Sequence, residues 1–471
     1  MVSYHSTNAD EKKAESVLGL DILQRNIAAG ATHDSGEEAD PPRCHPNTRT
    51  AVIQEIMGWV EDDDRETQFL WLEGPAGAGK TAIAHSVATL SQEKGRLVAG
   101  FFFSRTAAGR NDYKCLIPTI AYQLAQSIPE VRSFIEAAVV QDPAVFTKNL
   151  TAQIRHLIIQ PLKKAFENSC PPSTPNFILI DGLDECLPEK SQRTILEAMN
   201  TELRRGPLSF RIMIASRAEP DIQDVFDMEL VTTTAHITLD DKYKPDIDIG
   251  IYLRSNFADI LRKHRRNRGM ASLALPWPSE DNLKTIISRS SGQFIYPTTV
   301  IKYIDVRHQR PDERLKVVLS LPRPELDSRE EAENPFAILD ELYHEIFRTV
   351  VDISSTERVL GAILVLKTSL AVDDLESLLK LQPGDVEVIL CNLHSVLHVP
   401  NALDSSNPSR NHIRLHHASL GDFLFDLRRA GVYHIDIGSA HATLAECCLW
   451  AMSRKPIYSL EELSEDGPFY H

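Results

Sequence analysis

The chain has 471 residues, of which 42% are hydrophobic and 25% are charged, as is ordinary for a globular protein of two to four domains. A formal net charge of −16 argues against a general nucleic-acid binder. No apolar run approaches the roughly 20 residues that span a bilayer, and no secretory signal pattern begins the chain. The seven scattered cysteines include no Cys/His set at zinc spacing, so we expect reduced thiols in a cytoplasmic protein.

The first part of the chain leads up to one buried strand. Residues 1–45 are polar and are expected to form a lead and linker, with a helix over residues 12–27. Apolar residues at helical spacing predict a helix from Thr48 to Val60. The short aromatic and aliphatic segment from Gln68 to Glu73 then predicts a strand.

A glycine-rich run follows this strand and fits the pattern G-x-x-x-x-G-K-[ST] without a mismatch. Its residues are Gly74, Pro75, Ala76, Gly77, Ala78, Gly79, Lys80 and Thr81. Glycines let the backbone curl so that successive N–H groups point at phosphate oxygens, and the helix predicted from Lys80 to Leu90 adds a positive dipole end. We therefore predict a nucleotide phosphate loop, in which Lys80 reaches the β- and γ-phosphates and Thr81 binds Mg²⁺.

Strands and helices then alternate along the chain. Further buried strands are predicted over residues 96–103, 177–181, 210–216 and 236–239, and helices over 117–128, 131–140, 150–166 and 191–203. This alternation predicts an α/β fold with a doubly wound parallel sheet. Ligands of such sheets bind at the carboxyl ends of the strands, where Gly74, Asp181 and Arg217 all fall.

Acidic residues follow one of these strands directly. The apolar run Phe177-Ile-Leu-Ile ends in Asp181, which in a phosphate-loop enzyme would hold the Mg²⁺ shell opposite the Thr81 hydroxyl. A further acid is needed to polarise the attacking water, and Asp184 and Glu185 are the candidates. Glu185 is favoured as the base, while Asp184 could orient it or the metal.

Arg217 follows the strand predicted over residues 210–216, and two roles are compatible with this position. It could sense or stabilise the γ-phosphate, as an arginine supplied in cis does in other nucleotide hydrolases. The alternative is a surface arginine that caps a strand end.

The remainder of the chain is mostly helical. Helices are predicted over residues 247–264, 281–290, 294–306, 336–351, 357–366, 372–381, 386–397 and 441–452, with a polar connector over 315–334. A short strand is expected at 412–415, and residues 401–411 before it are typical of the wing of a winged helix-turn-helix.

Several of these segments together resemble the NACHT-type signal-transduction NTPases, in the branch common in fungi and near the nephrocystin-3-like N-terminal module. The likeness covers about residues 40–452. The segments that carry it are Arg43 to Arg49, Gly74 to Thr81, Asp181 to Cys186, Ala215 to Arg217, Gly292 to Tyr296, Leu415 to Leu424 and His441 to Leu449. A tiny residue directly after the metal-binding acid, with further acids displaced along the chain, is fairly specific to this family.

The resemblance implies a lead over residues 1–45, a nucleotide domain over 46–242, a helical domain and connector over 243–334, a winged helix over 335–430 and the start of a helical region over 431–471. It also implies that a winged-helix histidine, here His417, contacts the β-phosphate of ADP in a closed resting state. Exchange for ATP or GTP would then permit homo-oligomerisation. Family members often carry Gly-x-Pro at the start of the helical domain, and this proline contacts the nucleobase. Here Gly292-Gln-Phe lacks the proline, so the choice between ATP and GTP stays open.

Three functions are compatible with these features. The first is a slow NTPase that acts as a switch in non-self recognition or cell death, with separate sensor or effector partners. The second is an ordinary cycling ATPase or kinase. The third is a nucleic-acid binder, which the charge disfavours. The large helical carboxyl-terminal half favours the switch.

Overall fold

The computed structural model describes most of the chain. The described residues are 19–37, 41–62, 66–167, 174–203, 205–207, 209–264, 275–306, 309–322, 336–366, 370–400 and 412–454. They form two compact units, Met1–Leu339 and Asp340–His471.

A five-stranded parallel sheet organises the first unit, in the order β2-β3-β4-β1-β5. Its strands are β1 (Phe69–Glu73), β2 (Leu97–Phe102), β3 (Phe177–Asp181), β4 (Arg211–Ser216) and β5 (Thr234–Thr238). The predicted doubly wound α/β fold is confirmed. All five strands run in the same direction, so their carboxyl ends share one edge.

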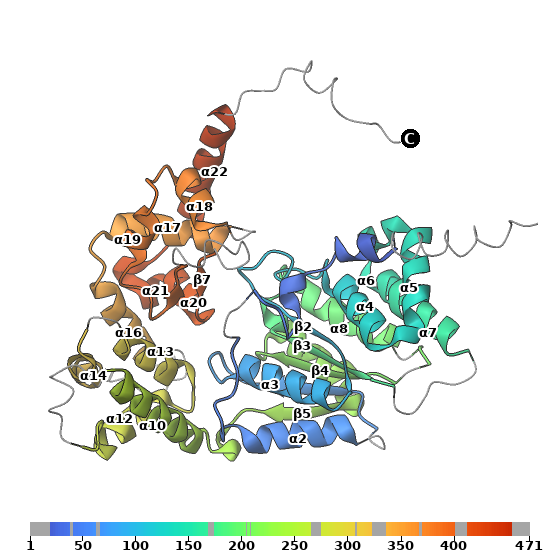
Figure 1. The fold of residues 1–471 in the computed structure, drawn as a ribbon, viewed down its shortest axis with the longest axis horizontal. Coiled ribbons are helices and arrows are strands. Elements are labelled where there is room, and N and C mark those ends of the chain that lie inside the picture. Colours follow the sequence, from blue (N-terminus) through green and yellow to red (C-terminus); the bar gives the residue numbers. More distant parts are fainter. Residues whose placement is uncertain are drawn as a thin grey trace, which may run out of the picture. The chain divides into compact units, whose positions relative to one another are not determined.

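Helices cover both faces of this sheet (Figure 1). Side chains alternate along each strand, so Leu70 and Leu72 face one core with helices α2 (Thr50–Glu61) and α3 (Lys80–Glu93), whereas Phe69 and Trp71 face the other. Helices of the second core are α4 (Leu116–Ser127), α5 (Pro129–Gln141), α6 (Leu150–Ile154), α7 (Gln160–Ala165) and α8 (Lys190–Leu203). Strands with both faces covered read as continuous apolar runs, which is why they could be found in the sequence.

Two predicted helices of this unit differ in detail. The helix predicted over residues 150–166 is interrupted by a π-helical turn at Arg155–Ile159, just before Pro161, whose ring nitrogen has no proton to donate to the helix ladder. Of the helix expected over residues 12–27, only residues 19–24 are both described and helical. A short helix α9 (Pro220–Asp224) precedes β5.

A helical layer follows the sheet in the same unit. It contains α10 (Pro245–Lys263), α12 (Glu280–Ser290), α13 (Ile295–Ile304) and α14 (Pro311–Ser320). The prediction of a connector over residues 315–334 is wrong for its first part, because α14 continues to Ser320. Pro311 at the first helical position and acids in the first turn favour this helix, and it buries Leu315 and Val318.

The second unit is built from short helices and one pair of strands. Its helices are α16 (Ala337–Arg348, which crosses the unit boundary), α17 (Ile353–Val365), α18 (Val372–Leu379), α19 (Asp385–Leu390), α20 (Ser419–Phe425), α21 (Leu427–Ala430) and α22 (Ile437–Arg454). Strands β6 (Leu397–His398) and β7 (Arg414–Leu415) pair antiparallel on either side of the predicted wing, residues 401–411, which lies outside the described residues.

The helix predicted over residues 386–397 is too long. Helix α19 ends at Leu390 and is followed by turns before β6 begins. The side chain of Asn392 donates to the Thr349 carbonyl instead of pointing away from a helix. Asn and Ser favour such turns over helix interiors, and the sequence 391–395 contains both. None of the described helices combines the length and the apolarity that a membrane crossing needs.

Candidate functional site

The candidate site lies at the carboxyl edge of the parallel sheet. In the strand register, Glu73 at the end of β1 pairs with Ser216 at the end of β4, and Asp181 at the end of β3 pairs with Ala215. The segments that leave these three strands therefore start side by side. This edge carries the glycine-rich loop, the acidic run and Arg217, as the sequence predicts.

The glycine-rich loop connects β1 to the amino-terminal end of α3. Gly77 and Gly79 have φ angles of +76° and +94°, a region that side chains with a Cβ rarely adopt. At Gly77 an added Cβ would also lie 2.2 Å from the Ile295 side chain, so no larger residue fits. Helix α3 begins at Lys80 with 14 residues, and its first N–H groups have no partner within the helix, which suits an anion.

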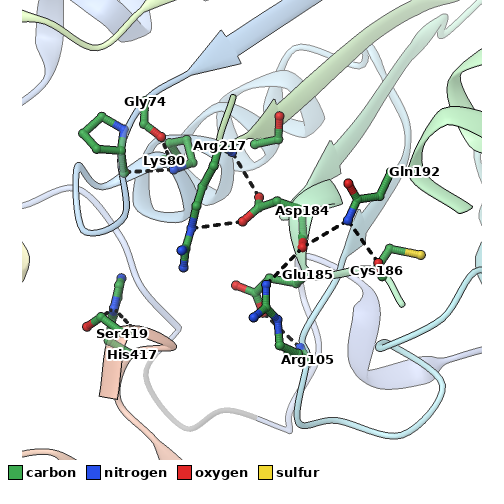
Figure 2. A network of polar contacts seen from close by, with 12 residues as sticks. Gly74, Lys80, Arg105, Asp184, Glu185, Cys186, Gln192, Arg217, His417 and Ser419 are labelled. Atoms are coloured by element: carbon green, nitrogen blue, oxygen red, sulfur yellow. Dashed lines mark hydrogen bonds and ion pairs between the residues drawn. The ribbon is translucent and has the colours of Figure 1, made fainter. Parts of the chain in front are cut away.

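The amino group of Lys80 lies inside the loop. Its Nζ donates to the carbonyl oxygens of Gly74, at 2.6 Å, and Pro75, at 3.0 Å (Figure 2). Burial lowers the pKa of Lys80, while the charges of Asp184 and Asp181 oppose that shift. The amino group thus lies where its two carbonyl partners could be exchanged for the oxygens of a bound phosphate.

Asp181 has the features of a ligand for a hard cation. Its side chain is 2% exposed, and its Oδ1 atom has no hydrogen-bond partner among the described residues. Burial raises its pKa to about 7, although a hydrogen bond with the Thr81 side chain opposes the rise. Oxygen ligands from a carboxylate and a hydroxyl fit Mg²⁺, which keeps water and phosphate oxygens for its other positions.

Asp184 is bound to Arg217 and to a neighbouring glutamine. The Arg217 backbone N–H donates to Oδ1 at 3.1 Å, and Arg217 Nε forms an ion pair with Oδ2 at 3.2 Å (Figure 2). Gln192 Nε2 donates to the carbonyl oxygens of Asp184, at 3.2 Å, and Cys186, at 3.1 Å. The Asp184 side chain is buried, so β3 and β4 are joined here by a shielded charge pair.

Glu185 is half-buried beside Arg105, a residue that the sequence analysis missed. The Arg105 backbone N–H donates to Glu185 Oε2 at 3.0 Å, and Arg105 Nη2 donates to the Asp184 carbonyl at 3.3 Å (Figure 2). Burial, and then the charge of Asp184, raise the pKa of Glu185. A signal for Arg105 exists in the sequence, because Ser104-Arg105 follows a buried strand as Ser216-Arg217 does.

The tiny residue after Asp181 has a structural reason. Gly182 has a φ angle of +70°, and an added Cβ would lie 3.3 Å from the Phe103 carbonyl oxygen. This conformation turns the chain from β3 into the short 3₁₀ segment Leu183–Glu185. Both further acids therefore lie on that segment instead of continuing the strand.

His417 belongs to the second unit, and its surroundings there define its chemistry. The Ser419 backbone N–H donates to His417 Nδ1 at 3.0 Å, and Ser419 Oγ lies 2.7 Å from the same nitrogen. An amide N–H can only donate, so Nδ1 is an acceptor and the neutral ring carries its proton on Nε2. Tyr343 Oη lies 2.8 Å from Ser419 Oγ and extends this chain.

Comparison with known proteins adds the following similarities. Residues 48–217 match the family model described as Nephrocystin 3, N-terminal. A signal transduction ATPase with numerous domains (STAND) that has a tetratricopeptide repeat sensor, from Pyrococcus horikoshii, is 10% identical with a TM-score of 0.42 over 88% of this chain. This chain spans about half, 47%, of the length of that protein.

A second solved structure, Drosophila ORC bound to DNA, is 12% identical with a TM-score of 0.35, over 80% of this chain and 96% of that one. No curated protein matches. The resemblance drawn from the motifs is confirmed at the level of the module. The segment 48–217, with its glycine-rich loop and displaced acids, matches the model of the nephrocystin 3 N-terminal family, which supports a NACHT-like module in this part of the chain.

Proposed function

We propose that the protein is a nucleotide-operated switch that binds ATP or GTP with Mg²⁺ and hydrolyses it slowly. The observation that carries this proposal is the convergence of the phosphate loop, the buried Asp181 and the Asp184–Arg217 pair at one edge of the sheet. Such an edge supplies hydrogen-bond donors for phosphate oxygens and a carboxylate for the metal. It also supplies an arginine, Arg217, that can respond to the γ-phosphate.

Each residue of this edge has a separate task. Lys80 exchanges its bonds to the Gly74 and Pro75 carbonyls for bonds to phosphate oxygens. The Thr81 hydroxyl and the Asp181 carboxylate would hold Mg²⁺, which neutralises charge on the β- and γ-phosphates when it is bound. Backbone N–H groups from Ala76 to Lys80 would surround the phosphates.

We assign the general base to Glu185 and a positioning role to Asp184. The raised pKa of Glu185 makes its carboxylate a better proton acceptor, and efficient bases have pKa values near the working pH. Asp184 is bound by two donors of Arg217 and orients that arginine. Arg217 then responds to the γ-phosphate.

His417 is assigned to the resting state. With Nδ1 accepting from the Ser419 amide, Nε2–H is the group that can donate to a phosphate oxygen. A ligand shifts a conformational equilibrium only through a difference in affinity for the two states. In this proposal, ADP binds the closed state through His417, and ATP or GTP favours an open state that associates with further copies.

The signalling context rests on the family resemblance. We propose a role in non-self recognition or cell death in the fungal branch, in the cytoplasm, with sensor or effector partners. The residues at the site support nucleotide binding, and the partners follow from the resemblance alone.

The first experiment is to measure the nucleotide content of the freshly purified protein. The protein is denatured and the released nucleotide is identified by chromatography, with Lys80→Ala in parallel. About one equivalent of ADP or GDP that is absent from the variant would support the switch. It would also show whether the protein prefers adenine or guanine nucleotides. An empty protein that hydrolyses ATP many times per second contradicts it and supports an ordinary cycling ATPase.

A further inference from the structure

Arg49 connects the phosphate loop to the helical layer of the same unit. Its Nη2 donates to the Ala78 carbonyl oxygen in the loop at 2.8 Å. Its backbone N–H donates to Asp248 Oδ2 on α10 at 2.9 Å. Its guanidinium carbon lies 4.9 Å from the centre of the Phe294 ring, just before α13, which is a cation–π distance.

This arrangement is costly for an arginine. Arg49 is 5% exposed, its φ angle is +56°, and burial lowers its pKa. Among the described residues, its Nε–H has no hydrogen-bond partner, and the charge of Asp248 only partly offsets the effect of burial on its pKa. Buried charges are normally paired, and strained backbone persists where the surrounding structure holds it, often at functional sites. A role beyond packing would account for this cost.

The contacts of the loop carbonyls indicate what that role is. The Gly74 and Pro75 carbonyls accept from Lys80, the Gly77 carbonyl from the Ile295 N–H at 3.2 Å, and the Ala78 carbonyl from Arg49. A peptide unit is planar and trans, so its N–H points opposite to its C=O. A donor that holds the Ala78 carbonyl therefore also fixes the direction of the Gly79 N–H.

The two contacts outside the loop differ from those of Lys80. Lys80 must leave its carbonyls to reach a phosphate, whereas Arg49 and Ile295 can keep theirs while a nucleotide is bound. Both residues are also linked to the helical layer. The Arg49 backbone N–H is bonded to Asp248 on α10, and Ile295 is the first residue of α13.

We propose that Arg49 is a positioning residue for phosphate recognition, which holds the Ala78–Gly79 peptide with its N–H toward the phosphates and ties that peptide to the helical layer. The ligand class is the polyphosphate part of a nucleotide, so the inference rests on the proposed nucleotide function. By linkage, a change on the helical-layer side of Arg49 also changes polyphosphate affinity.

The test compares ADP with inorganic pyrophosphate, which has no base. Affinities are measured by calorimetry for the full chain and for Arg49→Met, which keeps apolar bulk but loses the donor. We expect both ligands to bind about tenfold more weakly, since one aligned hydrogen bond and its preorganisation are lost. Arg49→Lys should recover part of the loss, because it keeps a cationic donor without the planar fork.

Arg211→Met is the matched control. Arg211 is another buried arginine, 6% exposed, that donates to a backbone carbonyl, that of Trp59, and lies over the Trp59 ring. It lies at the start of β4, at the opposite end of that strand from Ser216. Its loss should lower thermal stability without changing the affinity for pyrophosphate.

Asp248→Asn tests the link to the helical layer and also covers the case in which Arg49→Met fails to fold. It weakens the bond to the Arg49 amide without touching the loop, and we expect a loss of pyrophosphate affinity of about threefold.

Three results would overturn the proposal. Weaker ADP binding with unchanged pyrophosphate binding would mean that Arg49 contacts the nucleobase of ADP. Lower stability with both affinities unchanged would leave Arg49 a purely structural role. A wild-type protein that binds neither ligand would remove the proposed function itself, and this inference with it.

Discussion

Arg217 holds Asp184 with two of its own donors, the backbone N–H on Oδ1 at 3.1 Å and Nε on Oδ2 at 3.2 Å. A main-chain and a side-chain donor from one residue fix both the position and the direction of the carboxylate. Asp184 is held by Arg217, whereas the neighbouring Glu185 accepts from the backbone amide of Arg105. Two adjacent acids that look equivalent in the sequence therefore have different partners in the structure.

We expect Glu185→Gln to lower the rate of nucleotide hydrolysis by about 100-fold or more while nucleotide stays bound, since a general base contributes about that much. Single-turnover hydrolysis and calorimetry measure the two effects. Asp184→Asn should instead destabilise the fold by about 1–3 kcal/mol, because Arg217 loses a charged partner. Full hydrolysis in Glu185→Gln with none in Asp184→Asn would assign the base to Asp184.

Asp181 should make stability depend on pH. Its pKa is about 7 in the folded protein and 3.8 as its ordinary value, so between these pH values the folded state holds a proton that the unfolded state has released. The free energy of unfolding therefore falls as pH rises from about 4 to about 7, and this contribution is constant above pH 7. Thermal unfolding without Mg²⁺ should show this slope, and Asp181→Asn should flatten it; an unchanged slope contradicts the assignment.

Gly182→Ala should destabilise the protein by about 1–2 kcal/mol, because alanine is strained at a φ angle of +70° and its Cβ would crowd the Phe103 carbonyl. Urea unfolding measures the change. Gly58→Ala is the control: Gly58 lies within α2, and an added Cβ there has no atom within 4 Å. It should stabilise by up to about 1 kcal/mol. Equal effects at the two positions would argue against a conformational requirement at Gly182.

Ser419→Ala should weaken the preference of His417 for the tautomer protonated on Nε2. The substitution removes the hydroxyl near Nδ1, while the backbone donor of residue 419 stays. Nitrogen-15 NMR of the imidazole distinguishes the two neutral tautomers directly, and we expect the wild type to carry its proton on Nε2. Bound ADP should dissociate faster from Ser419→Ala and faster still from His417→Ala. Ser395→Ala is a suitable control, because Ser395 is equally buried in the same unit and its hydroxyl has no partner among the described residues. A wild-type ring protonated on Nδ1 would refute the assignment.

Part of the candidate site could be predicted from the sequence because its residues are adjacent in the chain. The loop from Gly74 to Thr81 and the acids from Asp181 to Glu185 each follow a strand that is apolar on both faces, so the pattern gives both the strand and its functional end. The boundaries of α14 and α19 were less predictable, because they depend on a proline start and on side-chain bonds such as that of Asn392.

The sequence by itself determined the parallel sheet, the glycine-rich loop and the place of the acids after a strand, since local apolar runs and glycine spacing carry that information. Only the tertiary structure decided which of these residues contact one another. The pairing of Asp184 with Arg217 arises because β3 and β4 are neighbours in the sheet, although their residues are 33 apart in the chain. The contact of Arg49 with Ala78 spans 29 residues, and that of Arg49 with Asp248 spans 199. No local pattern encodes such contacts, because they depend on how distant segments pack.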